Sequence, residues 1–169
     1  PTRIQKLFTG GGFNLSYNEK YEPLVLEIPA TAKRVEVVAH ISGHGWGKDI
    51  ENCAEFCNHT HHFTVNGTEY SHDHPWVGNT YGCAEQVTEG TVPNQFGTWT
   101  IGRSGWCPGK EVVPFIADVT GSVSPGDSAT IEYKGLFDGK DYEPVTNPNG
   151  NAGGFGANIW MESWLVIYE

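Results

Sequence analysis

The sequence has little positive charge, with ten lysines and arginines against twenty aspartates and glutamates, and a formal net charge of -10 at pH 7. A chain this acidic offers no basic patch that could follow a phosphate backbone or an anionic membrane surface. Long apolar runs are also lacking: the longest, such as 23–29 and 164–169, are far shorter than the roughly 20 residues of a membrane span. We therefore expect neither nucleic acid as a partner nor a membrane span.

Methionine occurs once, and no stretch shows the apolar periodicity of a helix. The 169 residues instead contain 22 glycines, 10 prolines and 12% aromatic residues, a composition typical of short strands joined by many turns. This length suits one domain with a sizeable core. These features predict an all-β chain in which residues 1–169 form a single antiparallel jelly-roll β-sandwich.

Seven runs of alternating or β-branched residues, each bounded by glycine, proline, asparagine or serine, predict the strands of this sandwich. They cover 21–28, 34–41, 60–65, 98–102, 111–118, 129–134 and 158–168. Asn66 and Gly67 supply the positive φ angles of a type I′ turn, which predicts a tight hairpin after the third run. Two irregular stretches, 71–97 and 135–157, have the length of functional loops.

The cysteine pattern indicates disulfide bonds. Cys53, Cys57, Cys83 and Cys107 do not show the Cys-x-x-Cys spacing that zinc sites prefer. An even number of cysteines without that spacing favours two disulfides, which persist in oxidising compartments. We therefore expect a secreted, periplasmic or otherwise extracytoplasmic protein.

Two histidines in one predicted strand indicate a metal site. Residues i and i+2 of a strand point to the same side, so His59 and His61 are expected to project together. Met161 lies in the last predicted strand, and a thioether beside two imidazoles favours copper over zinc, calcium or magnesium. Simpler interpretations exist, because a single methionine usually fills a core and paired histidines often bind nothing. A second pair, His72 and His74, is either a surface feature or an additional ligand set.

Four segments resemble, in order and spacing, the second domain of peptidylglycine α-hydroxylating monooxygenase. They are HTHH at 59–62, GTWTIGR at 97–103, a Gly-Asp turn at 126–127 and MESWLVIYE at 161–169. The resemblance implies that His59, His61 and Met161 ligate the copper ion at which oxygen is activated. It also implies dioxygen or peroxide and a reductant as reaction partners.

Two segments are similar to the C-terminal domain of peptide-N-glycosidase F, an amidase that removes N-linked glycans from asparagine. They are HISGHGWGKDIENCAEFC at 40–57 and GTWTIGRSGWCPG at 97–109. That family shares the paired jelly-roll architecture of the copper monooxygenases, which implies that this chain is equivalent to one half of a two-domain protein. The resemblance also implies the disulfides Cys53–Cys57 and Cys83–Cys107.

The amidase resemblance places Glu55 and Arg103 at a substrate site, with Glu55 held rigidly in the middle of a five-residue disulfide loop. The simpler alternative is that Glu55 is solvated and Arg103 pairs with a neighbouring carboxylate. In the amidase family the principal catalytic aspartate belongs to the other domain, so this half is either a working part of the site or scaffold without chemistry. Most tryptophans of a sandwich pack in its core, and we expect Trp106 first to contact a sugar or peptide.

Three hypotheses for the function follow. The first is a copper-binding domain with two histidine ligands and one methionine ligand, redox-active or monooxygenase-like. The second is the C-terminal half of a peptide-N-glycosidase F-like amidase that acts on N-glycans. The third is a non-catalytic module of a secreted protein that binds a peptide or glycan.

Overall fold

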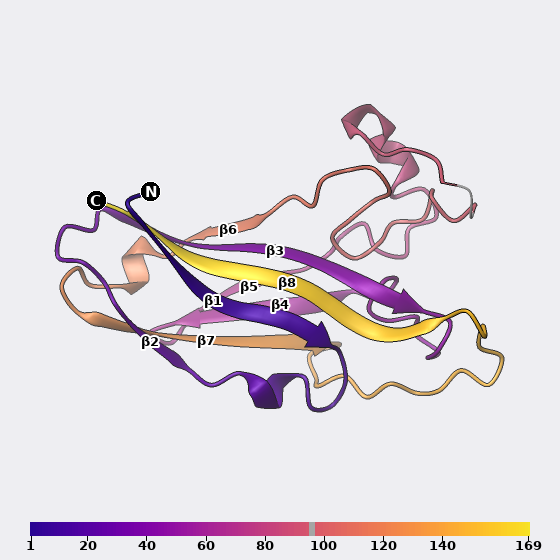
Figure 1. Ribbon diagram of the computed structural model, residues 1–169, viewed down its shortest axis with the longest axis horizontal. Helices are drawn as coiled ribbons and strands as arrows, with labels where there is room; N and C mark the ends of the chain where they lie inside the picture. The colour runs from indigo at the N-terminus through magenta and orange to yellow at the C-terminus, as the bar shows by residue number, and fades with distance from the viewer. Residues whose placement is uncertain (95–96) are drawn as a thin grey trace.

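The computed structural model describes residues 1–94 and 97–169, which form eight strands and three short 3-10 helices (Figure 1). The strands are β1 (Arg3–Gly12), β2 (Leu24–Glu27), β3 (Arg34–Trp46), β4 (His59–Val65), β5 (Thr68–His72), β6 (Phe115–Asp118), β7 (Ser128–Phe137) and β8 (Phe155–Tyr168). The helices are η1 (Asn18–Lys20), η2 (Ala84–Glu89) and η3 (Thr120–Ser122).

The strands form two antiparallel sheets packed face to face, as Figure 1 shows. One sheet has the order β1-β8-β3-β6 and the other the order β2-β7-β4-β5. Most connections cross from one sheet to the other, which is the arrangement of an eight-stranded jelly roll. The predicted all-β jelly-roll sandwich is confirmed.

The core lies between the sheets and follows from the two-residue period of the strands. In β8, Ile159, Met161, Ser163 and Leu165 share one buried face, as the alternation predicts. β8 pairs with β1 on one side and β3 on the other, so this face is central in its sheet. Apolar side chains of both sheets join it in one cluster.

Three of the predicted strands need correction. The predicted strand 98–102 is wrong, because these residues form turns in which Thr98 Oγ1 and the Ile101 carbonyl accept hydrogen bonds from the Arg103 guanidinium. The predicted strand 111–118 begins only at Phe115, since Pro114 has no amide hydrogen to donate. The predicted strand 21–28 is shortened to β2, which begins one residue after Pro23. β1 and β5 are strands beyond those predicted.

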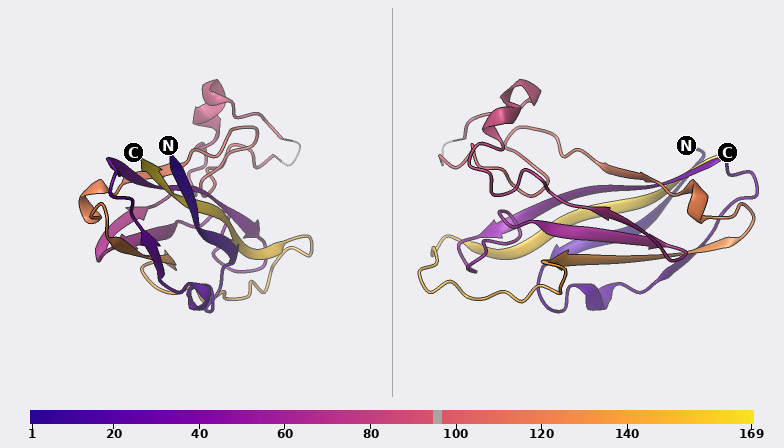
Figure 2. Two further views of the ribbon diagram at one scale, coloured as in Figure 1. Left: turned by 60° about the vertical axis from the view of Figure 1, so that its left-hand side comes forward. Right: turned by 180° about the vertical axis from the view of Figure 1, so that it is seen from behind.

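The two ends of the sandwich differ. Both termini lie at one end, while the connection from β5 to β6, which carries η2, and the connection from β7 to β8 lie at the other (Figures 1 and 2). The predicted irregular stretches correspond to these connections, except that residues 95–96 of the first lie outside the described residues. Among the described residues, no helix has the length and apolar character that crossing a membrane requires.

Candidate functional site

The face of β4 that points into the sandwich carries His59 and His61, neither of which has any exposed surface. Burial alternates along the whole strand, with Phe63 and Val65 continuing the same buried face. β4 lies between β5 and β7, so strands flank it on both sides in its sheet. The opposite sheet covers its inner face. The prediction that the two histidines project together is confirmed.

The two rings belong to a buried chain of polar atoms. His59 Nδ1 lies 2.8 Å from His61 Nε2, and His61 Nδ1 lies 2.7 Å from the hydroxyl of Tyr133 on β7. The Tyr133 hydroxyl is in turn 3.0 Å from that of Tyr17. The order of these contacts fixes which nitrogen of His61 faces His59, because the other nitrogen is already bonded to Tyr133.

His74 joins the pair from the segment that follows β5. Its ring centroid lies 4.5 Å from that of His59 and 5.5 Å from that of His61, and its side chain is buried. The backbone N–H of His74 donates to Asn58 Oδ1 at 2.9 Å, which fixes the entry of this segment beside the start of β4. The three rings each offer a nitrogen within 4.8 Å of the others.

All three histidines are neutral at pH 7. Burial lowers the pKa of His59 to about 3, an effect that the nearby Ala54 carbonyl partly opposes. Burial, followed by the neighbouring imidazoles, also lowers the pKa of His61 and His74 well below the ordinary range. A neutral imidazole keeps one lone pair, which is the form that binds a metal ion.

Met161 lies in the opposite sheet, on the buried face of β8 and paired in register with Ile41 of β3. Gly43 lies two residues after Ile41 on β3. A Cβ atom added at Gly43 would overlap His59 Nε2. The inward orientation of Met161 agrees with the predicted alternation, and its role as a copper ligand stays a prediction. Among histidine, cysteine and acidic side chains of the described residues, His74 is the third group that the fold brings against His59 and His61.

The structure brings Glu55 and Arg103 together. Arg103 Nε donates to Glu55 Oε1 at 2.9 Å, and both side chains are buried. The remaining guanidinium nitrogens donate to the Ile101 carbonyl and to Thr98 Oγ1, each at 3.2 Å. The guanidinium also stacks over the Trp106 ring at 4.8 Å from its centroid. These contacts fix the position of the Arg103 charge.

Backbone contacts join the loops that carry these two residues. Ser104 donates from its N–H to the Glu55 carbonyl at 2.9 Å and from its hydroxyl to the Cys57 carbonyl at 2.6 Å. Asp49 accepts hydrogen bonds from the backbone N–H of Cys53 at 3.1 Å and from the Tyr142 hydroxyl at 2.7 Å. The Cys53–Cys57 loop is thus held at both of its ends.

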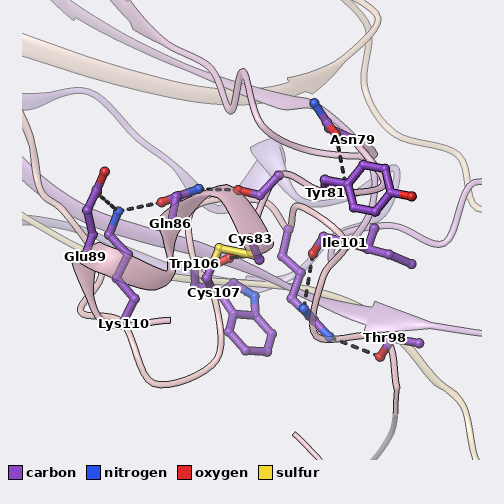
Figure 3. The surroundings of a disulfide bond; sticks show 12 residues. Asn79, Tyr81, Cys83, Gln86, Glu89, Thr98, Ile101, Trp106, Cys107 and Lys110 are labelled. Atoms are coloured by element: carbon purple, nitrogen blue, oxygen red, sulfur yellow. Dashed lines mark hydrogen bonds and ion pairs between the residues drawn. A yellow bond between two sulfur atoms is a disulfide. The ribbon is translucent and has the colours of Figure 1, made fainter. Parts of the chain in front are cut away.

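Two disulfides stabilise this end of the molecule, as predicted, with the pairings Cys53–Cys57 and Cys83–Cys107. Figure 3 shows that the second disulfide places the start of η2 beside the loop of Trp106. Lys110, three residues beyond Cys107, bonds Gln86 and Glu89 of η2. The long connection between β5 and β6 is therefore held together by a disulfide bond and by the hydrogen bonds of Lys110.

A pocket of about 310 Å³ opens along this connection. Its walls include His74, Arg103, Trp76 and Trp106. Trp76 is 48% exposed, so its ring is available to a ligand. Glu55 is not among the described residues that line this pocket, because it lies behind Arg103. The pocket combines aromatic surface with the cations of Arg103 and Lys110, a combination suited to a sugar or peptide.

A second hollow, of about 400 Å³, lies over the other sheet and is lined by segments of β1, β3 and β8. It includes His40, Trp160 and Met161 but neither Arg103 nor any of the three clustered histidines. The smaller of these two pockets is the candidate ligand site, because it is lined by Arg103 of the buried ion pair and by His74 of the histidine cluster.

Sequence reasoning predicted His59, His61, Glu55, Arg103 and Trp106 as site residues, and the fold places them at one end of the sandwich. Trp76 was one of the six tryptophans considered for a sugar- or peptide-binding surface but was not singled out, and His74 was left undecided. The His-x-His spacing of residues 72–74 was the available signal for His74. Tyr133 was missed because nothing in its own strand distinguishes it from a core tyrosine.

The fold and this site define a disulfide-linked jelly-roll domain with a polar pocket at one end. Residues 13–166 match the family model described as peptide-N-glycosidase F, C terminal. The chain belongs to this family. The family resemblance stated from the sequence is confirmed for the amidase, whereas the link to copper monooxygenases is not shown.

Individual relatives agree with this assignment. The chain is 30% identical over 114 residues, 64% of its length, to the peptide-N(4)-(N-acetyl-β-D-glucosaminyl)asparagine amidase F of Elizabethkingia miricola, of which it covers 30%. A crystal structure of a peptide-N(4)-(N-acetyl-β-D-glucosaminyl)asparagine amidase superposes with a TM-score of 0.70 at 20% identity, covering 97% of this chain and 51% of that one. PNGase F from Flavobacterium meningosepticum superposes with a TM-score of 0.65 at 21% identity, covering 99% and 51%. The chain thus spans about half of these solved structures.

Proposed function

We propose that this chain is the C-terminal half of an amidase that acts on N-glycoproteins, as one jelly-roll domain of a two-domain protein. The family match over residues 13–166 carries this proposal. The relatives named above, which are asparagine amidases, support it. The two disulfides support a place outside the cytoplasm.

Within this function, the pocket at Trp76, Arg103 and Trp106 binds the glycan or the peptide next to it. The flat faces of sugar rings pack on indole rings, and the guanidinium donates hydrogen bonds in a fixed direction. Glu55 acts through Arg103, whose orientation it fixes, and is a positioning residue. Because the chain covers only about half of its solved relatives, we expect it to bind substrate rather than to complete hydrolysis alone.

Calorimetric titration with an N-glycosylated peptide and with the same peptide after removal of its glycan tests this proposal. We expect the glycosylated form to bind more tightly, and Trp76→Ala to weaken its binding by about fivefold, the loss of about 1 kcal/mol of ring stacking. Trp160→Ala is the matched control, because Trp160 is 68% exposed but lies outside this pocket. Equal binding of the two peptides, or no difference between the two variants, would show that the pocket is not the glycan site.

The copper monooxygenase hypothesis is not supported by the family match, because the matched family and the relatives are amidases. Dioxygen, peroxide and a reductant are therefore not part of the proposed function. Copper stays a prediction for His59, His61 and Met161, none of which is among the described residues that line the pocket.

A further inference from the structure

Two of the clustered histidines have buried ring nitrogens without a partner. His59 Nε2 and His74 Nε2 are inaccessible to solvent and make no hydrogen bond of acceptable geometry to any described residue. An unsatisfied buried polar group costs about 1–3 kcal/mol, and native proteins contain few of them. The unpartnered His74 Nε2 points to a ligand in this cluster, whereas His59 Nε2 lies beside the Ala54 carbonyl.

One combination of ring tautomers directs two lone pairs at the same point, where a cation would be held. If His61 Nδ1 donates its hydrogen to the Tyr133 hydroxyl, His61 Nε2 presents a lone pair to His59 Nδ1. If His59 carries its hydrogen on Nε2, beside the Ala54 carbonyl, its Nδ1 also presents a lone pair to the same point. Two lone pairs 2.8 Å apart repel each other unless a proton or a metal ion lies between or beside them.

We propose that His59, His61 and His74 together bind one divalent transition-metal ion, of the class that includes Cu(II) and Zn(II). Neutral imidazole is a preferred ligand of both ions, and three imidazoles leave a fourth position open. Hard cations such as Mg(II) and Ca(II) prefer oxygen ligands and are not expected here. The site differs from the one that the sequence predicts, because His74 replaces Met161 as the third ligand.

The distances allow this site after small movements of the rings. Metal–nitrogen bonds of about 2.0–2.1 Å in a tetrahedron place ligand nitrogens roughly 3.3 Å apart. His59 Nδ1 and His61 Nε2 therefore have to separate by about half an ångström from 2.8 Å, and His74 has to approach from within 4.8 Å. His74 lies on a connection rather than in a strand, so this approach breaks no hydrogen bond between strands.

The surroundings supply the second layer of contacts that metal-binding histidines use. His61 Nδ1 lies 2.7 Å from the Tyr133 hydroxyl, which is itself 3.0 Å from the Tyr17 hydroxyl. Partners of this kind fix the tautomer and orientation of a ligating ring. The formal charge of -10 favours the approach of a cation to the protein as a whole.

Binding is tested by stripping the purified chain with a chelator and titrating it separately with Cu(II), Zn(II) and Mg(II) by calorimetry. We expect one Cu(II) or Zn(II) per chain, with a dissociation constant of about 10 µM or lower, and no binding of Mg(II). The paramagnetic resonance spectrum of the Cu(II) form should show coupling to three nitrogens. Failure of both Cu(II) and Zn(II) to bind below about 1 mM would overturn the proposal.

Variants identify the ligands. His74→Ala and the isosteric Tyr133→Phe should each weaken binding by at least about tenfold, whereas His40→Ala, which removes an exposed histidine, should not. Met161→Leu should leave Cu(II) and Zn(II) affinity unchanged. A loss with Met161→Leu but not with His74→Ala would overturn this ligand set in favour of the two-histidine, one-methionine site.

If the variants fail to fold, nuclear magnetic resonance of the chain without substitutions provides an independent test. Zn(II) should shift the ring nitrogen resonances of His59, His61 and His74, and perturbation of exposed histidines alone would contradict the site. The result is independent of the proposed function, because the glycopeptide titration is done on the metal-stripped chain. Binding of metal without glycopeptide, or the reverse, therefore separates the two proposals.

Discussion

Trp106 donates its indole N–H to the carbonyl oxygen of Gly43, at 2.8 Å. The N–H of Gly43 donates to the Ser104 carbonyl at 2.8 Å, and the position where Gly43 lacks a side chain faces His59 Nε2 and the Ala54 carbonyl. Gly43 of β3 thus contacts Trp106 in the wall of the pocket and faces His59 of the histidine cluster. A change at Gly43 therefore affects both sites at once.

We expect Gly43→Ala to destabilise the protein by about 2–3 kcal/mol, because the new methyl group would overlap a backbone carbonyl and a buried ring that cannot both move aside. Urea denaturation measures this loss. Gly156→Ala in β8 is the matched control, since an added Cβ there meets nothing within 4 Å. Equal stability of the two variants would mean that β3 and the Cys53–Cys57 loop separate easily.

The buried pair of Glu55 and Arg103 should show strong energetic coupling. Arg103→Met leaves the Glu55 carboxylate without its partner, and we expect a loss of about 3–5 kcal/mol in the free energy of unfolding. Glu55→Gln should cost a similar amount, while the double variant should cost clearly less than the sum of the two. A double-mutant cycle by urea denaturation provides the measurement, and simple additivity would contradict the coupling.

Stability should fall in alkaline solution partly through Tyr142. Burial and the hydrogen bond to Asp49 raise the pKa of Tyr142 above its usual value of about 10. The unfolded chain therefore releases this proton first as the pH rises, so the stabilisation is complete below about pH 10 and is lost above it.

Tyr142→Phe tests this dependence. Because phenylalanine cannot donate a hydrogen bond to the Asp49 carboxylate, we expect the variant to be less stable than the parent by about 1.5–3 kcal/mol at pH 7. Above about pH 10 the variant should lose less additional stability than the parent. Tyr81→Phe, at a position 62% exposed, serves as the control. Parallel stability curves for the parent and Tyr142→Phe across pH 9–11 would be the contrary result.

The two disulfides should differ in their contribution to stability. The Cys53–Cys57 bridge closes a loop with a sequence separation of 4, and the Cys83–Cys107 bridge one with a separation of 24. By the chain-entropy relation, replacing each pair by alanine should cost about 2 and about 3.5 kcal/mol, respectively. Denaturation of the two double variants measures the order, and a larger loss for the shorter loop would point to strong local contacts of Glu55 instead.

The strands were predictable where alternation is regular. β4, β7 and β8 were found within a few residues of their observed limits because one face of each packs on the core. β1 was missed because its pairing with β8 is interrupted by register shifts around Thr9, and its glycine-rich end resembles a loop. Gly10 fits there because an added Cβ would meet the Ile159 carbonyl of β8, a contact that depends on the folded sheet.

The site was predictable only in part, because some of its contacts follow from local strand geometry and others depend on the folded connections. The common orientation of His59 and His61 follows from local geometry, whereas the position of His74 depends on how the connection after β5 folds back. The family resemblance placed Glu55 and Arg103, residues 48 positions apart, at one substrate site, but it did not predict that they form an ion pair. The segment 98–102 was wrongly predicted as a strand. Two of its residues instead accept hydrogen bonds from the Arg103 guanidinium.

The position of both termini at the end of the sandwich opposite the pocket has a practical consequence (Figures 1 and 2). A fluorophore, an affinity tag or a sensor surface attached through either terminus would leave the mouth of the pocket unobstructed. Immobilised chain is therefore suited to screening glycopeptide libraries.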